Sequence, residues 1–145
     1  MYWVLILSAV VVLPAERSRD SAGPDETMLQ GRWEYVSVRV DGQPFPLEKG
    51  DYMMISGRNV SVHRNKMVIK AKYTLAPNTN PKHIDLLIER DETTFRLKEI
   101  YKLENDKLTL CEPPHPEAPR PTTFSAEKGE RQFLIILKRS ILKEK

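Results

Sequence analysis

The sequence predicts an all-β protein, a single antiparallel up-and-down barrel of eight or nine strands. From Glu26 onward, apolar residues recur at every second position, which is the period of a strand and not of a helix. Turn signals such as Asp41-Gly42 and Asn105-Asp106 separate these segments by short connections. A meander of this kind removes its exposed edges when it closes, so we favour a barrel over a sandwich.

The expected strands are 32–40, 52–56, 59–63, 66–75, 83–89, 94–103, 107–111, 122–125 and 132–139. A short helical turn at 26–29 can precede the first of them. Within 32–40 the apolar phase changes between Tyr35 and Val36, which predicts a bulge. The clearest alternation is at 66–75, where apolar and basic side chains take opposite faces, as in a sheet with one face in water.

The N-terminal segment has the composition of an export signal. Residues 2–13 form an apolar run interrupted only by Ser8, too short to span a bilayer, which needs about 20 residues. We therefore expect a signal peptide or N-terminal apolar segment at 1–15, a flexible leader at 16–26 and the barrel domain at 27–141. The protein is expected to be exported, periplasmic or extracellular; an uncleaved N-terminal anchor is the alternative.

The composition fits one soluble domain. Of 145 residues, 40% are hydrophobic and 30% charged, and the net charge of +3 is too small to indicate a nucleic-acid partner. The single cysteine, Cys111, allows no internal disulfide, which leaves a buried inert thiol or an intermolecular bond. We expect a monomer with no membrane span.

Closure of the barrel would place the first and last strands side by side. Trp33, at the start of the first strand, would then lie beside Arg139, at the end of the last. A guanidinium stacked on the indole would seal the barrel floor through a cation–π contact. Gly31, Trp33 and Arg139 are therefore interpreted as structural residues.

These residues belong to a longer series of motifs. The motifs are Leu29-Gln30-Gly31-x-Trp33, Asp41-Gly42, Pro81-Lys82-x-Ile84-Asp85-Leu86, Leu108-x-Leu110-Cys111, Arg120-Pro121-Thr122-x-Phe124 and Leu137-Lys138-Arg139. In this order they resemble a bacterial family of small lipocalin-like domains of unknown function that is abundant in planctomycetes. The resemblance covers about residues 27–141 and implies a lipocalin-like barrel; it supplies no catalytic residues.

The interior is expected to be bulky. The residues expected to face it are Met54, Met67, Ile69, Tyr73, Leu86, Phe95, Leu97, Tyr101 and Phe133. Side chains of this size allow either a filled core or a pocket for one small apolar ligand. In the second case the candidate cavity residues are Tyr73, Glu99, Tyr101, Met67 and Phe95, with Tyr73, Tyr101 and Glu99 as polar anchors.

Glu99 is the carboxylate of greatest interest. It shares its phase with Leu97 and Tyr101, and a carboxylate inside a barrel is costly unless it is paired or neutral. Perturbed carboxylates cluster at functional sites. The alternatives are a bulge that turns Glu99 to water, or a pairing with an inward Arg or Lys.

The sequence carries no motif for catalysis, metal or cofactor binding. The three histidines lack metal-ligand spacing, and there is no phosphate loop or nucleophile elbow. Between Asp51 and Asp85 the charged residues are all basic, namely Arg58, Arg64, Lys66, Lys70, Lys72 and Lys82. This stretch indicates an anionic surface partner or an ordinary solvated face.

We therefore expect a non-enzymatic, exported binding module of lipocalin-like type whose ligand the sequence does not identify, a small apolar molecule in the barrel being one candidate. The alternative is a protein-interaction or inhibitor module with a solid core. It would act through the Pro-rich loop at 112–116 and the basic strand face.

Overall fold

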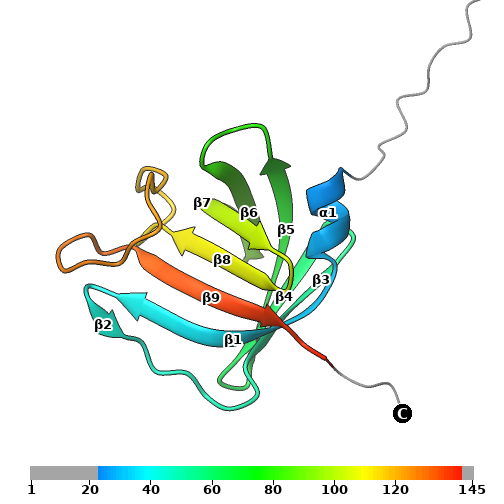
Figure 1. Ribbon diagram of the computed structural model, residues 1–145, viewed down its shortest axis with the longest axis horizontal. Helices are drawn as coiled ribbons and strands as arrows, with labels where there is room; N and C mark the ends of the chain where they lie inside the picture. The colour runs from blue at the N-terminus through cyan, green and yellow to red at the C-terminus, as the bar shows by residue number, and fades with distance from the viewer. Residues whose placement is uncertain (1–22, 142–145) are drawn as a thin grey trace, which may run out of the picture.

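The computed structural model describes residues 23–141. They form one antiparallel sheet in the order β2-β1-β3-β4-β5-β6-β7-β8-β9, and a further pairing of β1 with β9 closes it (Figure 1). The elements are α1 (Pro24–Leu29), β1 (Gly31–Val40), β2 (Gln43–Pro44), β3 (Tyr52–Ser56), β4 (Asn59–Arg64), β5 (Met67–Ala76), β6 (Lys82–Arg90), β7 (Thr93–Glu104), β8 (Lys107–Glu112) and β9 (Phe133–Arg139). The predicted up-and-down, lipocalin-like barrel is confirmed, with two-residue β2 as an extra strand outside the closed set.

The end of the barrel next to α1, here called the closed end, is sealed by the predicted pair of residues. Trp33 lies opposite Arg139 in the β1–β9 ladder, and the Arg139 guanidinium lies 4.4 Å from the centre of the indole ring. The Trp33 Nε1–H donates to the Leu29 carbonyl at 2.8 Å, and both Trp33 and Leu29 are fully buried. Gly31 has φ +115°, a backbone conformation that other residues rarely adopt, and lies close to Arg139.

The phase change in the first strand is a β-bulge, as predicted. The β1–β9 register shifts between Tyr35 and Ser37, so Val36 has no partner and is half exposed. The bulge allows both Trp33 and Val38 to face the interior although they are five positions apart.

The opposite end of the barrel, here called the open end, carries the β4–β5 and β6–β7 turns and the long loop at 113–132. Both turns are two residues long, Asn65-Lys66 and Asp91-Glu92, and all four residues have positive φ. This conformation matches the strand twist of tight hairpins.

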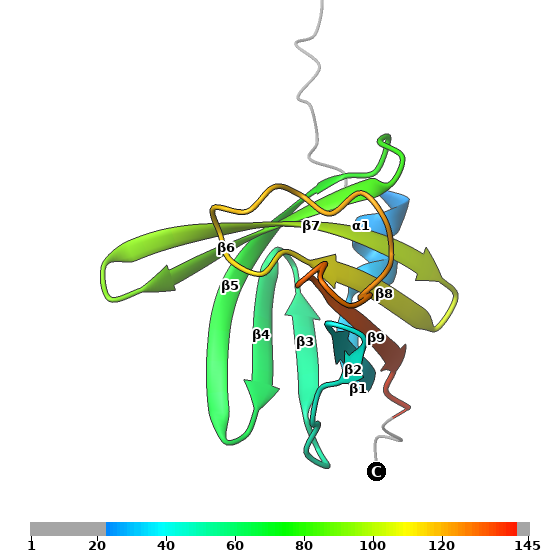
Figure 2. The same ribbon diagram turned by 90° about the vertical axis from the view of Figure 1, so that its left-hand side faces the viewer.

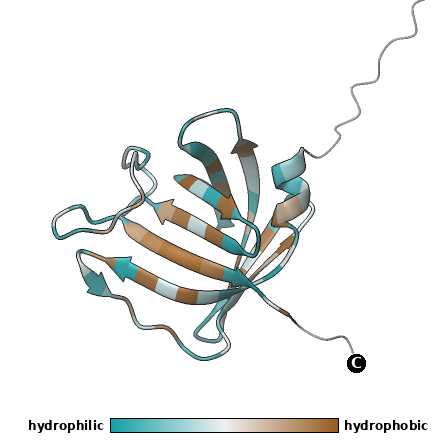
Figure 3. Ribbon diagram, in the orientation of Figure 1, coloured by the Kyte–Doolittle hydropathy of each residue, from teal (hydrophilic) through white to brown (hydrophobic). Residues whose placement is uncertain are grey.

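The loop at 113–132 replaces the strand expected at 122–125, and that prediction is wrong. The carbonyls of Thr123 and Ser125 accept hydrogen bonds from the Gln132 side chain instead of from a neighbouring strand. The loop covers the outer face of β7 and β8, where Ile100 and Cys111 are fully buried although they point away from the interior. It is anchored by Arg120 Nη1–H, which donates to the Glu99 carbonyl at 2.8 Å. This cover explains why outer as well as inner positions of the last strands are apolar (Figure 3).

Two further expectations differ in detail. The core residue of β3 is Met53, 5% exposed and opposite Trp33, whereas Met54 faces outward and is only half-buried. The helix begins at Pro24, earlier than the expected turn, and Asp25 contacts the barrel through Lys82. Residues 1–15 and most of the expected leader lie outside the described residues.

The core fills the closed half of the barrel. Its buried members include Trp33, Tyr73, Tyr101, Leu108 and Leu137, each 2% exposed or less. On β5, β6 and β7 the exposure of the inward side chains rises toward the open end. Among residues 23–141, no helix has the length and apolar character needed to cross a membrane.

Candidate functional site

The strands β5 and β6 separate toward the open end. Their pairing runs from Ala76–His83 to Ala71–Ile88, so residues 67–70 of β5 have no partner on β6. The β6–β7 ladder continues as far as Arg90–Thr93. Figure 2 shows the β6–β7 hairpin directed away from the lower part of β5. The inner face of the sheet is therefore accessible between these two strands.

A cleft of about 510 Å³ lies at this separation. Its inward-facing lining residues are Met67, Ile69, Ile88, Phe95, Leu97 and Glu112, and the loop contributes residues 114–116. Met67, Ile69 and Phe95 are 60%, 43% and 38% exposed, which is high for large apolar side chains in the inward phase of a barrel. The volume is within the range of small-molecule pockets.

A second hollow of about 410 Å³ adjoins the cleft, and Met67 and Ile69 line both. Its other side is formed by Phe45 and Arg64. Phe45 packs edge-on against Phe133, with ring centres 6.0 Å apart. The open half is thus an apolar depression in two connected parts.

Two carboxyl groups meet at the floor of the cleft. The β7–β8 ladder pairs Ile100 with Cys111, which places Glu99 directly opposite Glu112. Glu99 is 1% exposed, and within residues 23–141 its Oε2 receives no hydrogen bond from any amide, hydroxyl or basic group. Glu112 is partly exposed and lines the cleft. The sequence allows two alternatives for Glu99, a bulge that turns it to water and a pairing with an inward base. Within the described residues Glu99 does neither.

Burial raises the pKa of both carboxyl groups, and the Glu112 charge raises that of Glu99 further. A hydrogen bond from Glu99 and the charge of Arg64 partly offset the rise in the pKa of Glu112. Of the two groups, Glu99 is the one held more strongly in the protonated state. The floor therefore presents the Glu112 carboxyl group to the cleft, with Glu99 behind it.

The nearest basic group is engaged elsewhere. The Arg64 guanidinium lies 3.7 Å from the Asp51 carboxylate, 5.3 Å from the Tyr35 ring centre and 5.2 Å from that of Phe45. Burial, which outweighs the effect of Arg64, raises the pKa of Tyr35 well above its ordinary value. Arg64 thus closes one side of the open end and forms no ion pair with Glu112 among the described residues.

The five candidate cavity residues separate into two groups. Met67 and Phe95 line the cleft, and Glu99 lies behind its floor. Tyr73 and Tyr101 are at the closed end and do not line this cleft. The Tyr101 hydroxyl donates to Asp25 at 2.7 Å, and that of Tyr73 donates to the Gly57 carbonyl at 2.8 Å.

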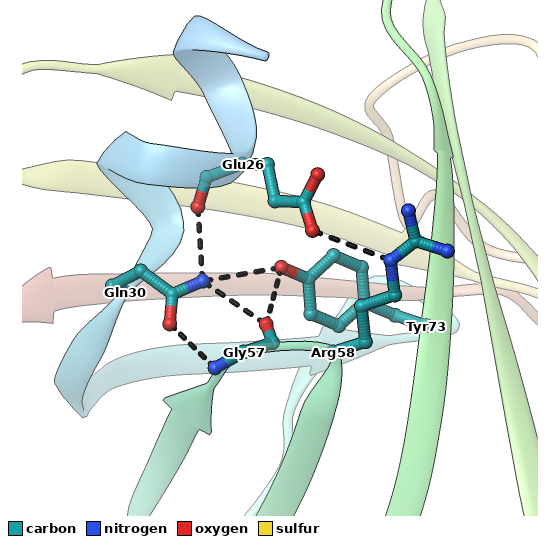
Figure 4. A network of polar contacts seen from close by, with 5 residues as sticks. All are labelled: Glu26, Gln30, Gly57, Arg58 and Tyr73. Atoms are coloured by element: carbon teal, nitrogen blue, oxygen red, sulfur yellow. Dashed lines mark hydrogen bonds and ion pairs between the residues drawn. The ribbon is translucent and has the colours of Figure 1, made fainter. Parts of the chain in front are cut away.

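The contacts of Tyr73 belong to a network that fixes α1 to the β3–β4 turn (Figure 4). The Gln30 amide nitrogen donates to the carbonyls of Glu26 and Gly57, each at 3.0 Å, and its oxygen accepts from the Gly57 N–H at 2.7 Å. Glu26 also pairs with Arg58 at 3.4 Å. Every group in this network has a protein partner, which makes its role structural. A hollow of about 480 Å³ beside it is bordered by Gly23, the first described residue.

Sequence reasoning missed Glu112, although a signal for it was present. The Asn105-Asp106 turn sets a hairpin in which Glu104 pairs with Lys107. Moving five positions away from the turn along each strand leads to Glu99 on β7 and Glu112 on β8, which therefore lie opposite each other. The inward position of Glu99 therefore implied that a second carboxylate faced it.

The other singled-out residues do not form a site. Cys111 is buried under the loop, its Sγ is 3.6 Å from the Ser125 carbonyl, and burial raises the pKa of the thiol to about 11. His63 stacks on Tyr52 with ring centres 4.2 Å apart, outside the barrel. Within residues 23–141 there is no group of three or more potential metal ligands.

The basic stretch is partly neutralised. Arg58, Arg64 and Lys82 pair with Glu26, Asp51 and Asp25 respectively. Lys66, Lys70 and Lys72 are exposed and form no ion pair within the described part of the chain.

Comparisons with protein-family models, curated proteins and solved structures found no significant match to this chain.

Proposed function

We propose that the protein is a non-enzymatic binding module that holds one small, largely apolar molecule in the cleft between β5 and β6. The observation that carries this proposal is the exposure of Met67, Ile69 and Phe95 on the inward face of the barrel. Transfer of apolar surface from water to a ligand contact gives about 25 cal/mol per Å². These side chains therefore provide a driving force for binding that the filled closed half cannot provide.

The geometry supports a ligand that enters from the side. The cleft opens between two strands, and residues 114–116 of the loop form part of its wall. The apolar inner wall and the polar group of Glu112 at the floor are typical of pockets in which apolar contacts give affinity and a few polar groups give orientation. Export from the cytoplasm, and the resemblance to the planctomycete lipocalin-like family, remain predictions from the sequence.

The proposal is tested by native mass spectrometry of the protein purified gently from its own producer. We expect an adduct of a few hundred daltons, the size that such pockets accept, which is lost on denaturation. In Ile69→Trp, an indole occupies the cleft, and we expect the adduct to disappear while the barrel remains folded. Lys72→Trp, on the exposed outer face of the same strand, is the matched control and should retain the adduct.

A clean apo mass for the wild-type protein, together with no binding of apolar probes, would overturn the proposal. The protein would then be better described as a surface-mediated interaction module with a solid interior. An adduct that persists in Ile69→Trp would place the ligand elsewhere and would also overturn it.

A further inference from the structure

Within residues 23–141, every buried or half-buried carboxylate has an ion pair with a base except the two at the cleft floor. Asp25 pairs with Lys82 at 2.8 Å, and Asp85 pairs with Arg120 at 2.7 Å and with Arg96 at 2.9 Å. Asp51 has Arg64. Glu112 lies opposite Glu99 in a largely apolar wall; the charge of Arg64 acts on it from a distance, but it has no ion pair within residues 23–141.

We propose that the ligand is an amphipathic amine whose protonated amino group binds Glu112 at the cleft floor, with its apolar portion on Met67, Ile69 and Phe95. This inference rests on the proposed function and adds the chemical class of the ligand. Glu99, behind Glu112 and sealed from water, is a positioning residue that holds the Glu112 carboxylate in place.

The physical reason is the cost of a half-buried carboxylate that has no basic partner. A carboxylate removed from water without a partner loses hydration that no dipole of the protein restores. An ammonium group supplies a positive charge and three N–H donors, so it compensates this loss in a way that an alcohol cannot. A fatty acid, by contrast, would bring a second negative charge to the same point.

The surrounding charges agree with this assignment. Arg64 of β4 faces the interior, where its Nε lies 3.7 Å from Asp51 and its guanidinium lies over Tyr35 of β1, and it forms no ion pair with Glu112 among the described residues. On the outer side, Arg120 of the loop is held by Asp85 of β6 and by the Glu99 carbonyl. The remaining charged residues of the cleft are Glu89, Lys70 and Arg90, and these lie at its exposed rim, where solvent and salt screen them.

The test uses three probes of equal chain length, octylamine, octan-1-ol and octanoate, titrated calorimetrically into the full-length protein at neutral pH. We expect octylamine to bind on the order of tenfold more tightly than octan-1-ol, the difference typical of one hydrogen bond to a charged group. Octanoate is expected to bind more weakly than the alcohol.

The matched variants are Glu112→Gln and Glu89→Gln. Glutamine keeps the shape of the side chain and removes an unmatched charge, so Glu112→Gln should fold and should bind octan-1-ol as the wild-type protein does. Its preference for the amine should disappear. Glu89→Gln removes a carboxylate from the exposed rim of the same cleft and should leave the preference intact.

The inference is overturned if octan-1-ol binds as tightly as octylamine, if octanoate binds best, or if Glu112→Gln retains the preference. In all these outcomes the cleft still binds an apolar chain, and the proposed function stands. If none of the probes binds, both the inference and the proposed function are overturned. Failure of the inference alone and failure of the proposed function therefore give different results.

Discussion

The Glu99 carboxyl group combines nearly complete burial with the absence of a base against it. Its neighbours in the inward phase, Leu97 and Tyr101, are buried core residues, and the group opposite is Glu112. A folded protein tolerates such a pair because one carboxyl group stays protonated. The stability of the barrel is therefore coupled to pH through this site.

We predict that Glu99→Gln raises the free energy of unfolding at neutral pH by about 1–2 kcal/mol, since the variant removes a buried ionisable group without changing its volume. The pKa of Glu99 is higher in the folded than in the unfolded protein. The folded state thus binds more protons above the unfolded pKa, and wild-type stability falls as pH rises toward the folded pKa. Urea unfolding of both proteins from pH 4 to pH 8 should show a difference that grows with pH.

Asp85→Asn is the control of opposite sign. Burial opposes ionisation of Asp85, but Arg120 and then Arg96 lower its pKa below the ordinary value. Its contribution is present above the unfolded pKa and is lost as pH falls through the folded pKa. The substitution should cost about 1–2 kcal/mol at neutral pH. Equal pH profiles for wild type and Glu99→Gln would show that Glu99 ionises freely.

At the scale of the element, α1 is too short to be stable alone. It is held because β9 ends in Arg139, whose Nη2–H and Nη1–H donate to the carbonyls of Met28 and Gln30 at 2.6 and 2.8 Å. These are carbonyls at the helix C-terminus that have no partner within a helix. The Arg139 side chain, at the end of the last strand, thus links the Trp33 ring at the barrel floor to the helix that precedes the first strand.

Arg139→Met should lower the free energy of unfolding by about 2–3 kcal/mol, since it removes the cation–π contact and leaves two carbonyls without donors. Thermal unfolding followed by circular dichroism measures this loss. Asp106→Asn changes the exposed partner of Arg139 and should alter stability by less than about 0.5 kcal/mol. Similar losses in the two variants would mean that the seal contributes no more than an exposed ion pair.

Tyr73→Phe tests the separation of the closed end from the cleft. It removes the hydroxyl that donates to the Gly57 carbonyl and should cost about 1 kcal/mol. Octan-1-ol affinity, measured by calorimetry, should stay unchanged because Tyr73 does not line the cleft. A fall in octan-1-ol affinity with no fall in stability would show that Tyr73 contacts the ligand.

At the scale of the whole molecule, the sequence predicted the features that depend on local spacing. The alternation of apolar and polar residues predicted the strands, and the phase change between Tyr35 and Val36 predicted the bulge. Closure of the meander predicted that Trp33 lies beside Arg139. The separation of β5 from β6 depends on contacts between distant segments, so no local pattern marks Met67 and Ile69 as exposed. The hydrogen bonds of the Tyr73 and Tyr101 hydroxyls at the closed end also join distant segments, so they could not be predicted from local pattern either.

The division of the barrel into a filled half and an open half is tested most directly by methyl NMR of the methionines. Met67 lies in the cleft, Met53 in the closed-end core, and Met28 on α1. On titration with octan-1-ol, we expect the Met67 methyl resonance to shift to saturation while those of Met53 and Met28 stay in place. Shifts at Met53 without Met67, or no shift at any methionine, would contradict a binding cleft between β5 and β6.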